Sequence, residues 1–462
     1  MTWLRAHRVD VALVALVLAL SAPVVQEMRA QQASRIALTA AIWDDGSLRI
    51  DDYRLGLDRA ERDGHVYSDK APGQPMFAIP AYATYRLLGG EPARDFRVEG
   101  NLGLWATTIW SSVLPLAILL LLVRRVADEA APGKGVLVAV LTYVATLLFP
   151  FSTVLFGHAL SACLAFAGWY AIRHRHRSNA ALVASGALFG AAVLVEYTVA
   201  LAALVTGALL LWSERARVWR FVAGAAPFAL MLGAYQWAAF GSPTEFSYAH
   251  SSFTQTAQEK GLEPYRLPFL ENSARVFFGE RGLLIVSPIV LMAVMGMVVV
   301  LRQREPAHDR VALIAAAASA ASLLAVQMAW SNPTGGDSPG PRYATAGIAF
   351  LTPGLAIAAK RWPVATRVTG AVGGVVMLAA TWTDPLDTSP TESAIHLWLD
   401  RFLTGDWSNT LFEMVAGPGA AILWPILAVA AVWVLVRADR GSSEPVASAP
   451  RVAPASEPTV AT

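Results

Sequence analysis

Acidic side chains are concentrated in one early stretch of the chain, residues 43–73. Asp44 and Asp45 are adjacent there, and mutual repulsion with partial desolvation can raise the pKa of one such carboxyl toward the range of a general base. The same pair suits a hard divalent cation (Mg²⁺ or Mn²⁺), which takes oxygen ligands, and His65 could join it. The alternative is a solvated loop in which nearby arginines neutralise the acids. We interpret the pair as catalytic and leave a metal ion open.

The second candidate in this stretch is Lys70, which follows Tyr67 and Asp69 and precedes the dipeptide Pro72-Gly73. A Pro-Gly dipeptide favours a turn, so the lysine is expected at a defined place near the membrane surface. Its ammonium group is a compact positive charge that could bind a lipid phosphate. The alternative is a lysine that contacts bulk lipid headgroups.

Two ionisable residues, His158 and Glu196, stand in otherwise apolar segments. Ionisable groups inside membrane helices are costly, so they often mark functional sites. We expect both near the external ends of their helices, where they support the site. A structural role, capping or bridging helices, is the alternative.

Further candidates lie in later loops. Arg342 opens an apolar segment after a Gly/Pro-rich loop that could aim its guanidinium at a phosphate, although Asp337 could instead pair with it. Arg281 enters an apolar segment from the expected external side, where a basic residue needs a partner. His250 and Tyr248 belong to an aromatic loop that could stack on sugar rings, or that gathers aromatics because it lies on a membrane.

The composition defines the class of protein that must position these residues. The 462-residue chain is 55% hydrophobic and only 15% charged, which indicates an all-α polytopic membrane protein. A net charge of +2 without a basic face gives no reason to expect nucleic acid as a partner. The single cysteine, Cys163, excludes an intrachain disulfide.

Apolar segments predict about twelve membrane helices. The first resembles a signal peptide, but because many spans follow we interpret it as a retained anchor helix. The predicted spans are 9–26, 101–123, 135–150, 153–172, 179–195, 197–212, 218–240, 283–301, 311–330, 343–360, 364–382 and 417–436.

Arginine and lysine residues in the short loops predict the orientation, because such residues accumulate on the cytoplasmic side. These basic residues all lie on one face of the membrane if the whole segment 27–99 lies on the other face. In that case the apolar stretch 76–88 does not cross the membrane but lies along its surface. Both termini are then cytoplasmic in a bacterial inner (plasma) membrane. The predicted domain is 1–437, its external segments are 27–99, 241–281, 331–342 and 383–416, and a disordered cytoplasmic tail covers 438–462.

These features together resemble the GT-C superfamily of membrane glycosyltransferases. The most similar group within it includes protein mannosyltransferases and lipid A aminoarabinose transferases, and in the latter an Asp-Glu pair is followed about thirty residues later by Glu-Lys-Pro-Pro. The counterparts here are Asp44-Asp45 and the segment 69–72, Asp-Lys-Ala-Pro, where Ala71 departs from the usual pattern. The resemblance implies that an early-loop aspartate is the catalytic base and that Lys70 contacts polyprenyl phosphate. Some members transfer arabinofuranose or mannose in cell-envelope synthesis.

The expected function is therefore inverting transfer of a sugar, of the arabinofuranose or mannose type, from a polyprenyl-phosphate donor. The acceptor would be an envelope glycan, lipid or protein on the external face. Lys70, Arg342 and Arg281 would bind the donor phosphate, and Asp44 or Asp45 would be the base. No Gly-rich phosphate loop is present, which argues against a nucleotide donor. The alternatives are a transporter or flippase of lipid-linked glycans, an O-antigen-ligase- or polymerase-like enzyme, and a non-catalytic scaffold.

Overall fold

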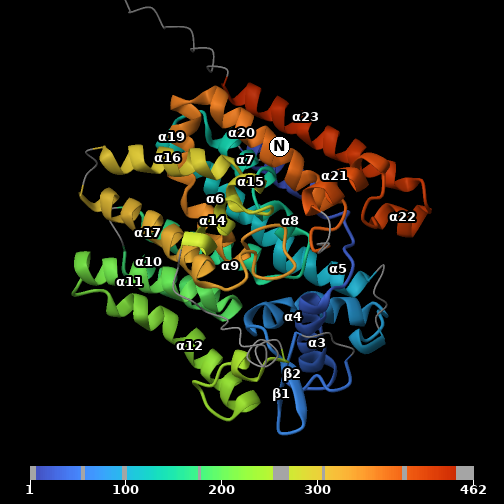
Figure 1. The fold of residues 1–462 in the computed structure, drawn as a ribbon. Coiled ribbons are helices and arrows are strands. Elements are labelled where there is room, and N and C mark those ends of the chain that lie inside the picture. Colours follow the sequence, from blue (N-terminus) through green and yellow to red (C-terminus); the bar gives the residue numbers. More distant parts are fainter. Residues whose placement is uncertain are drawn as a thin grey trace, which may run out of the picture.

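Helices make up most of the described structure, with one two-stranded sheet among them (Figure 1). The structure is a computed structural model. It describes residues 7–53, 58–95, 101–174, 178–252, 270–303, 307–387 and 393–443. In the view of Figure 1 the small hairpin lies at the bottom of the molecule and the C-terminal helix α23 (Leu423–Ser443) at the top. The predicted tail from residue 444 onward lies outside the described residues.

Five helical stretches in the described ranges are long and apolar enough to cross a membrane. They are the stretch formed by α5 (Leu102–Thr108), η2 (Ile109–Val113) and α6 (Leu114–Ala130), then α12 (Trp219–Phe240), α17 (Ala307–Ala329), α20 (Pro363–Trp382) and α23. A sixth candidate is a pair bent by 93°, which joins α14 (Leu270–Phe278) and α15 (Leu283–Val286) to α16 (Ile289–Arg302). The helical membrane architecture is thus confirmed, but the number of about twelve spans is not.

The difference arises because several predicted spans are short or divided helices. The first, α2 (Arg8–Ser21), has 14 residues. The segment 343–360 is divided at Leu351 into α18 (Thr345–Phe350) and α19 (Thr352–Arg361). The other shorter apolar helices are α7 (Gly135–Val144), α9 (Gly157–Ile172), α10 (Asn179–Val195) and the stretch of η3 (Tyr197–Val199) with α11 (Ala200–Ser213). Hydropathy alone does not reveal where such helices break.

Shorter elements connect these helices along the chain. They are α3 (Ala30–Asp44), β1 (Arg59–Arg62), β2 (His65–Ser68), α4 (Gly73–Leu87), η1 (Ala93–Asp95), α8 (Leu148–Ser152), η4 (Ser247–His250), η5 (Arg342–Ala344), α21 (Ala394–Thr404), α22 (Leu411–Ala416) and η6 (Ala420–Ile422).

The hairpin of β1 and β2 brings the segment that carries Lys70 into place. Its strands are antiparallel, with Arg59 opposite Ser68 and Arg62 opposite His65. The two residues between them, Asp63 and Gly64, have φ of 51° and 77°. Positive φ at both central residues matches the twist of a two-residue hairpin turn, for which Asp-Gly is a strong sequence signal.

Helix α4 covers the segment that was expected to lie along the membrane surface. Its first residue, Gly73, packs against the end of α10, where a Cβ atom would lie 2.5 Å from the backbone carbonyl carbon of Leu194. No side chain larger than hydrogen fits at that distance. The glycine therefore lets the turn after Lys70 come close to the helix that ends at Glu196.

An aromatic core holds the element that carries Arg342. The Phe350 ring of α18 lies 5.9 Å from that of Phe166 and 6.4 Å from that of Trp169, both on α9. All three side chains are buried, and such edge-to-face ring contacts add to the hydrophobic gain. The turn η5 immediately precedes α18, so this packing sets the position of Arg342.

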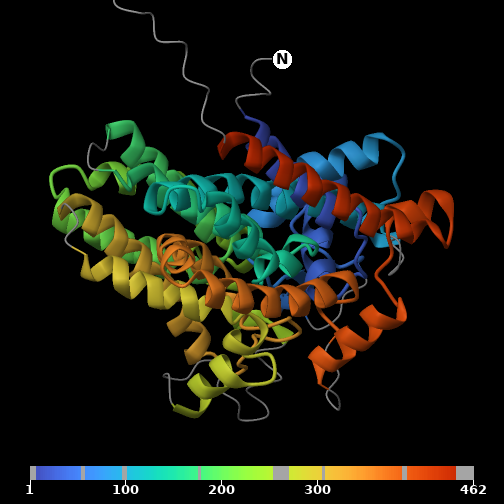
Figure 2. The same cartoon turned by 90° about the horizontal axis from the view of Figure 1, so that it is seen from above.

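Several helix ends lie close together on the face that is predicted to be rich in arginine and lysine. Arg124 at the end of α6 forms an ion pair of 2.8 Å with Asp10 at the start of α2. Arg173 after α9 is paired with Glu129, also near the end of α6. Helix α2 packs against α23, and both lie beside one another in Figures 1 and 2. The orientation of this face relative to the cell remains a prediction.

Candidate functional site

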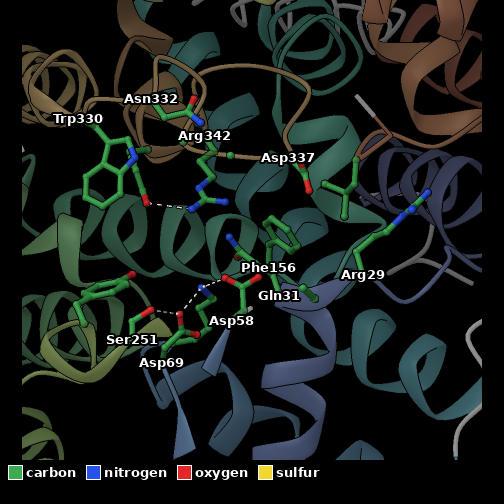
Figure 3. A pocket seen from close by; sticks show the side chains of 17 residues that line it. Arg29, Gln31, Asp58, Asp69, Phe156, Ser251, Trp330, Asn332, Asp337 and Arg342 are labelled. Atoms are coloured by element: carbon green, nitrogen blue, oxygen red, sulfur yellow. Dashed lines mark hydrogen bonds and ion pairs between the residues drawn. The ribbon is translucent and has the colours of Figure 1, made fainter. Parts of the chain in front are cut away.

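A cavity of about 360 Å³, lined by several charged side chains, lies where the hairpin, the start of α3 and the loop after α17 meet (Figure 3). Segments far apart in the sequence contribute to it. Its lining residues are Arg29, Ala30, Gln31, Asp58, Asp69, Lys70, Phe156, Tyr248, Ser251, Trp330, Asn332, Gly335, Gly336, Asp337, Arg342, Tyr343 and Leu386. Of the chemical candidates singled out from the sequence, Asp69, Lys70, Tyr248, Asp337 and Arg342 line this cavity.

Lys70 is buried between two carboxylates. Its side chain is 6% exposed, and its Nζ donates to Asp58 Oδ1 at 2.6 Å and to Asp69 Oδ2 at 3.1 Å. Only Asp69 separates Lys70 from the end of β2, and the turn into α4 follows it, so regular elements hold the backbone on both sides. The prediction that the Pro-Gly turn presents Lys70 at a defined place agrees with this geometry.

Asp69 is the more deeply buried of the two carboxylates, with a side chain 1% exposed. Ser251 Oγ donates to its Oδ2 at 3.0 Å, and Ser247 Oγ donates to its backbone carbonyl at 2.9 Å. Its Oδ1 has no hydrogen-bond partner among the described residues. Burial raises the pKa of Asp69, against the opposing effect of the Lys70 ammonium.

Asp58 faces the same ammonium group from the cavity side. Burial alone would raise its pKa, but the charge of Lys70 and the hydrogen bond from it outweigh burial, so the pKa of Asp58 lies below its ordinary value. The side chain is 21% exposed. Asp58 is therefore an ionised carboxylate that reaches the cavity.

Arg342 enters the cavity from the opposite side, as Figure 3 shows. Its side chain is buried, and its Nη2 donates to the hydroxyl oxygen of Tyr343 at 3.0 Å. No carboxylate of the described chain lies within 4 Å of its guanidinium nitrogens. A buried guanidinium that faces a cavity and has no ion-pair partner among the described residues is available to bind an anion.

The loop before Arg342 fits closely around its side chain. Gly335 and Gly336 have φ of 84° and 114°, which L side chains rarely adopt. A Cβ atom on Gly335 would lie 2.8 Å from Arg342 Nε. Arg281 supports the same loop, because its Nη1 donates to the carbonyl of Ser338 at 2.7 Å. Arg281 itself does not line the cavity.

Behind the cavity lies a buried group that includes both ionisable residues noted in apolar segments. His158 Nδ1 lies 3.6 Å from Glu196 Oε2, and the His158 ring contacts that of Tyr343 at 6.2 Å. Arg35 of α3 is buried beside them, donates from Nη1 to Gln31 Oε1 at 3.0 Å and interacts electrostatically with Glu196. His158 and Glu196 thus come together next to the cavity without lining it.

The predicted catalytic pair, Asp44 and Asp45, does not line the cavity. Asp44 accepts from Tyr82 Oη at 2.7 Å and from Arg86 Nε at 2.9 Å. Asp45 accepts from Tyr53 and forms an ion pair of 2.8 Å with Arg94. Each carboxylate is thus neutralised by an arginine, as in the alternative considered from the sequence. Asp44 ends α3 and Asp45 follows it, whereas the cavity is lined by residues at the start of that helix.

Three other predicted residues also lie outside the cavity lining. His65 Nδ1 lies 2.9 Å from Asp51 Oδ2, on the hairpin. The rings of Tyr67 and His250 both pack against that of Phe240, at 5.5 Å and 5.3 Å. In the part of the chain that the structure describes, no three His, Cys, Asp or Glu side chains form a metal site.

The sequence-based prediction missed Asp58, although the sequence contained a signal that could have identified this cavity residue. The Asp63-Gly64 turn sets the register of the hairpin, in which Arg59 lies opposite Ser68. Continuing the same register by one residue places Asp58 opposite Asp69. Arg29, Asn332 and Trp330 had no comparable signal. They reach the cavity through the packing of α3 and of the loop after α17.

Solved structures of other proteins share this fold. No protein-family model matches the sequence, and no curated protein sequence matches it. ArnT from Cupriavidus metallidurans, solved with bound undecaprenyl phosphate, is similar with a TM-score of 0.50 and 15% identity over 95% of this chain and 76% of that chain. AglB from Archaeoglobus fulgidus, an archaeal oligosaccharyltransferase solved with an inhibitory peptide and a dolichol-phosphate, is similar with a TM-score of 0.52 and 12% identity. That similarity covers 96% of this chain and 56% of AglB.

These similarities define the class of fold. The chain has the fold that ArnT and AglB share, in agreement with the helical membrane architecture expected from the sequence.

Proposed function

We propose that the chain is an integral membrane glycosyltransferase that transfers a sugar from a polyprenyl-phosphate donor to an acceptor hydroxyl. The observation that carries the proposal is the buried Arg342 guanidinium, which has no carboxylate partner in the described chain and lines the same cavity as Lys70. Two cations that converge on a small cavity in a GT-C fold suit the phosphate of a lipid-linked sugar.

In the proposed reaction, Arg342 and Lys70 bind the donor phosphate, and Arg281 acts indirectly by holding the loop that contains Gly335 and Gly336. The two cations stabilise the negative charge that grows on the leaving phosphate when the bond to the anomeric carbon breaks. A carboxylate accepts the proton of the acceptor hydroxyl, which attacks from the opposite face with inversion.

The sequence-based prediction assigned the base to Asp44 or Asp45, and their ion pairs with arginine support a structural role instead. We therefore propose the base among the cavity carboxylates. The sugar, of arabinofuranose or mannose type, and the acceptor, an envelope glycan, lipid or protein, remain part of the proposal. So does an external active site in a bacterial plasma membrane with both termini cytoplasmic.

Binding of undecaprenyl phosphate to the purified, detergent-solubilised full chain tests the phosphate site. We expect Lys70→Ala and Arg342→Ala each to weaken binding by about 10- to 100-fold, because each removes a charge-assisted hydrogen bond in a partly dry site. Arg275→Ala is the matched control, since Arg275 is an exposed arginine paired only with Glu271 among the described residues. Wild-type affinity in both cavity variants, or no binding to the wild type, would contradict the proposal.

A second assay tests turnover. The protein is incubated with a panel of polyprenyl-phosphate sugars, and the release of free polyprenyl phosphate is measured. We expect the wild type to consume at least one donor of the panel and the two cavity variants to consume none at a comparable rate. Consumption of no donor would remove the transferase proposal even if the lipid phosphate binds.

A further inference from the structure

The two carboxylates that neutralise Lys70 differ in how firmly they are held. Asp69 is 1% exposed, and its Oδ2 also accepts from Ser251 Oγ. Asp58 is 21% exposed and lies in the loop before β1, and its carboxylate accepts a hydrogen bond from Lys70. Asp69 is thus the more deeply buried partner of Lys70, whereas Asp58 has the shorter contact with it but lies nearer to solvent.

A phosphate that enters the cavity must compete for Lys70. The ammonium group has three donors, and the two carboxylates already neutralise more than its single charge. A third anion beside them would be repelled unless one carboxylate moves away. Asp69 cannot move without leaving its charge buried and unpaired, whereas Asp58 already reaches the solvent-accessible cavity.

We infer that the donor phosphate displaces Asp58 from Lys70, and that the released Asp58 carboxylate is the base that accepts the proton of the acceptor hydroxyl. This inference rests on the proposed function. Donor binding thereby prepares the base, so the donor binds before the acceptor reacts.

The step balances as a group transfer without an additional reactant. The acceptor oxygen forms a bond to the anomeric carbon, the bond from that carbon to the phosphate oxygen breaks, and the electron pair leaves on the polyprenyl phosphate. The hydroxyl proton passes to Asp58, which returns it to solvent and pairs with Lys70 again when the product has left.

The exchange also makes Asp58 a stronger base at the moment it is needed. In the structure Lys70 lowers the pKa of Asp58, against the effect of burial. When the ammonium pairs with phosphate instead, that stabilisation of the ionised form is lost and the pKa rises. A base that stayed paired with Lys70 would be weaker.

Asp58→Asn separates this role from a structural salt bridge. The amide keeps the size of the side chain but removes the charge that competes with phosphate. We expect undecaprenyl phosphate to bind about fivefold more tightly than to the wild type, since one ion-pair competitor is gone. We expect release of polyprenyl phosphate from the sugar-loaded donor to fall by about 100-fold or more, because the base is missing.

Asp52→Asn is the matched control, since Asp52 is 79% exposed in the same loop region and its ion pair with Arg94 is long, at 4.0 Å. Thermal unfolding of each variant reports whether the fold is retained. Asp58→Glu keeps the carboxylate, and we expect it to recover part of the turnover that Asp58→Asn loses.

Two results would overturn the inference while leaving the proposed function intact. One is a loss of undecaprenyl phosphate binding in folded Asp58→Asn similar to that in Lys70→Ala, which would make Asp58 a structural support for Lys70. The other is full turnover by Asp58→Asn. Failure of the wild type to bind the lipid phosphate would instead remove the proposed function itself.

Discussion

The carboxylates of this chain differ in the groups that neutralise them, and this difference distinguishes a structural role from a proposed role in the reaction. Asp44 lies between the Tyr82 hydroxyl and the Arg86 guanidinium, and it joins the end of α3 to α4. Asp58 is bound to a lysine that faces a cavity large enough for a phosphate group. A carboxylate that links two helices contributes stability, whereas one that can leave its partner is available to a substrate.

This difference predicts the behaviour of Asp44→Ala. The change leaves the partly buried Arg86 and the Tyr82 hydroxyl without their acceptor, so we expect the free energy of unfolding to fall by about 1–3 kcal/mol. Thermal or denaturant unfolding of the purified protein measures the change. Asp400→Ala, which alters an exposed side chain of α21, is expected to change stability by about 0.5 kcal/mol or less. Unchanged stability with lost turnover in Asp44→Ala would return the base to the position predicted from the sequence.

At the scale of elements, the loop after α17 and the turn η5 determine where the Arg342 guanidinium lies. Two glycines in left-handed conformations let the loop fold back over that side chain. The aromatic contacts between α9 and α18 then hold the turn from the other side. The anion site therefore depends on two elements that meet only through packing.

Gly335→Ala tests this dependence. The added Cβ would lie 2.8 Å from Arg342 Nε, so the guanidinium must shift, and we expect binding of undecaprenyl phosphate to weaken by about tenfold. Gly405→Ala is the control, because Gly405 has a similar φ of 81° but no atom within 4 Å of the position that its Cβ would take. Gly405→Ala therefore introduces the same backbone strain as Gly335→Ala but no close contact with another side chain. Equal affinity in the two variants would show that Arg342 does not need this loop.

At the scale of the whole molecule, the basic helix ends and the cavity belong to different regions of the bundle. The ion pairs between Arg124 and Asp10 and between Arg173 and Glu129 gather the ends of α2, α6 and α9. Lys70 and Arg342 lie instead beside the hairpin and the loop after α17. This separation is what the positive-inside pattern predicts for an enzyme with an external site.

Cysteine labelling in intact cells tests the orientation, because the native Cys163 is buried and should not react. Thr244→Cys and Ala216→Cys place exposed thiols at the two ends of α12, a candidate span. We expect a membrane-impermeant maleimide to label Thr244→Cys from outside and Ala216→Cys only after the cells are opened. The reverse pattern would place the cavity on the cytoplasmic side.

The amino-acid sequence was sufficient to predict the helical membrane class and the turn that follows Lys70. These features depend on local chemistry, namely apolar length, the distribution of arginines and a Pro-Gly turn, which can be detected along the linear chain. Arg342 could also be singled out in this way, because the glycines and prolines before it indicate a shaped loop.

The sequence alone did not reveal which carboxylates lie beside Lys70 and Arg342, and this became evident only in the folded chain. Asp44 and Asp45 looked catalytic as an adjacent pair, but helix packing gives each an arginine partner outside the cavity. Asp58 looked like one acid among many until the hairpin brought it to Lys70. The number of helices that can cross the membrane was likewise set by breaks such as that at Leu351. The physical reason is common to all three cases, because pairing between charges and the breaking of helices depend on neighbours that are distant in sequence and meet only through tertiary packing.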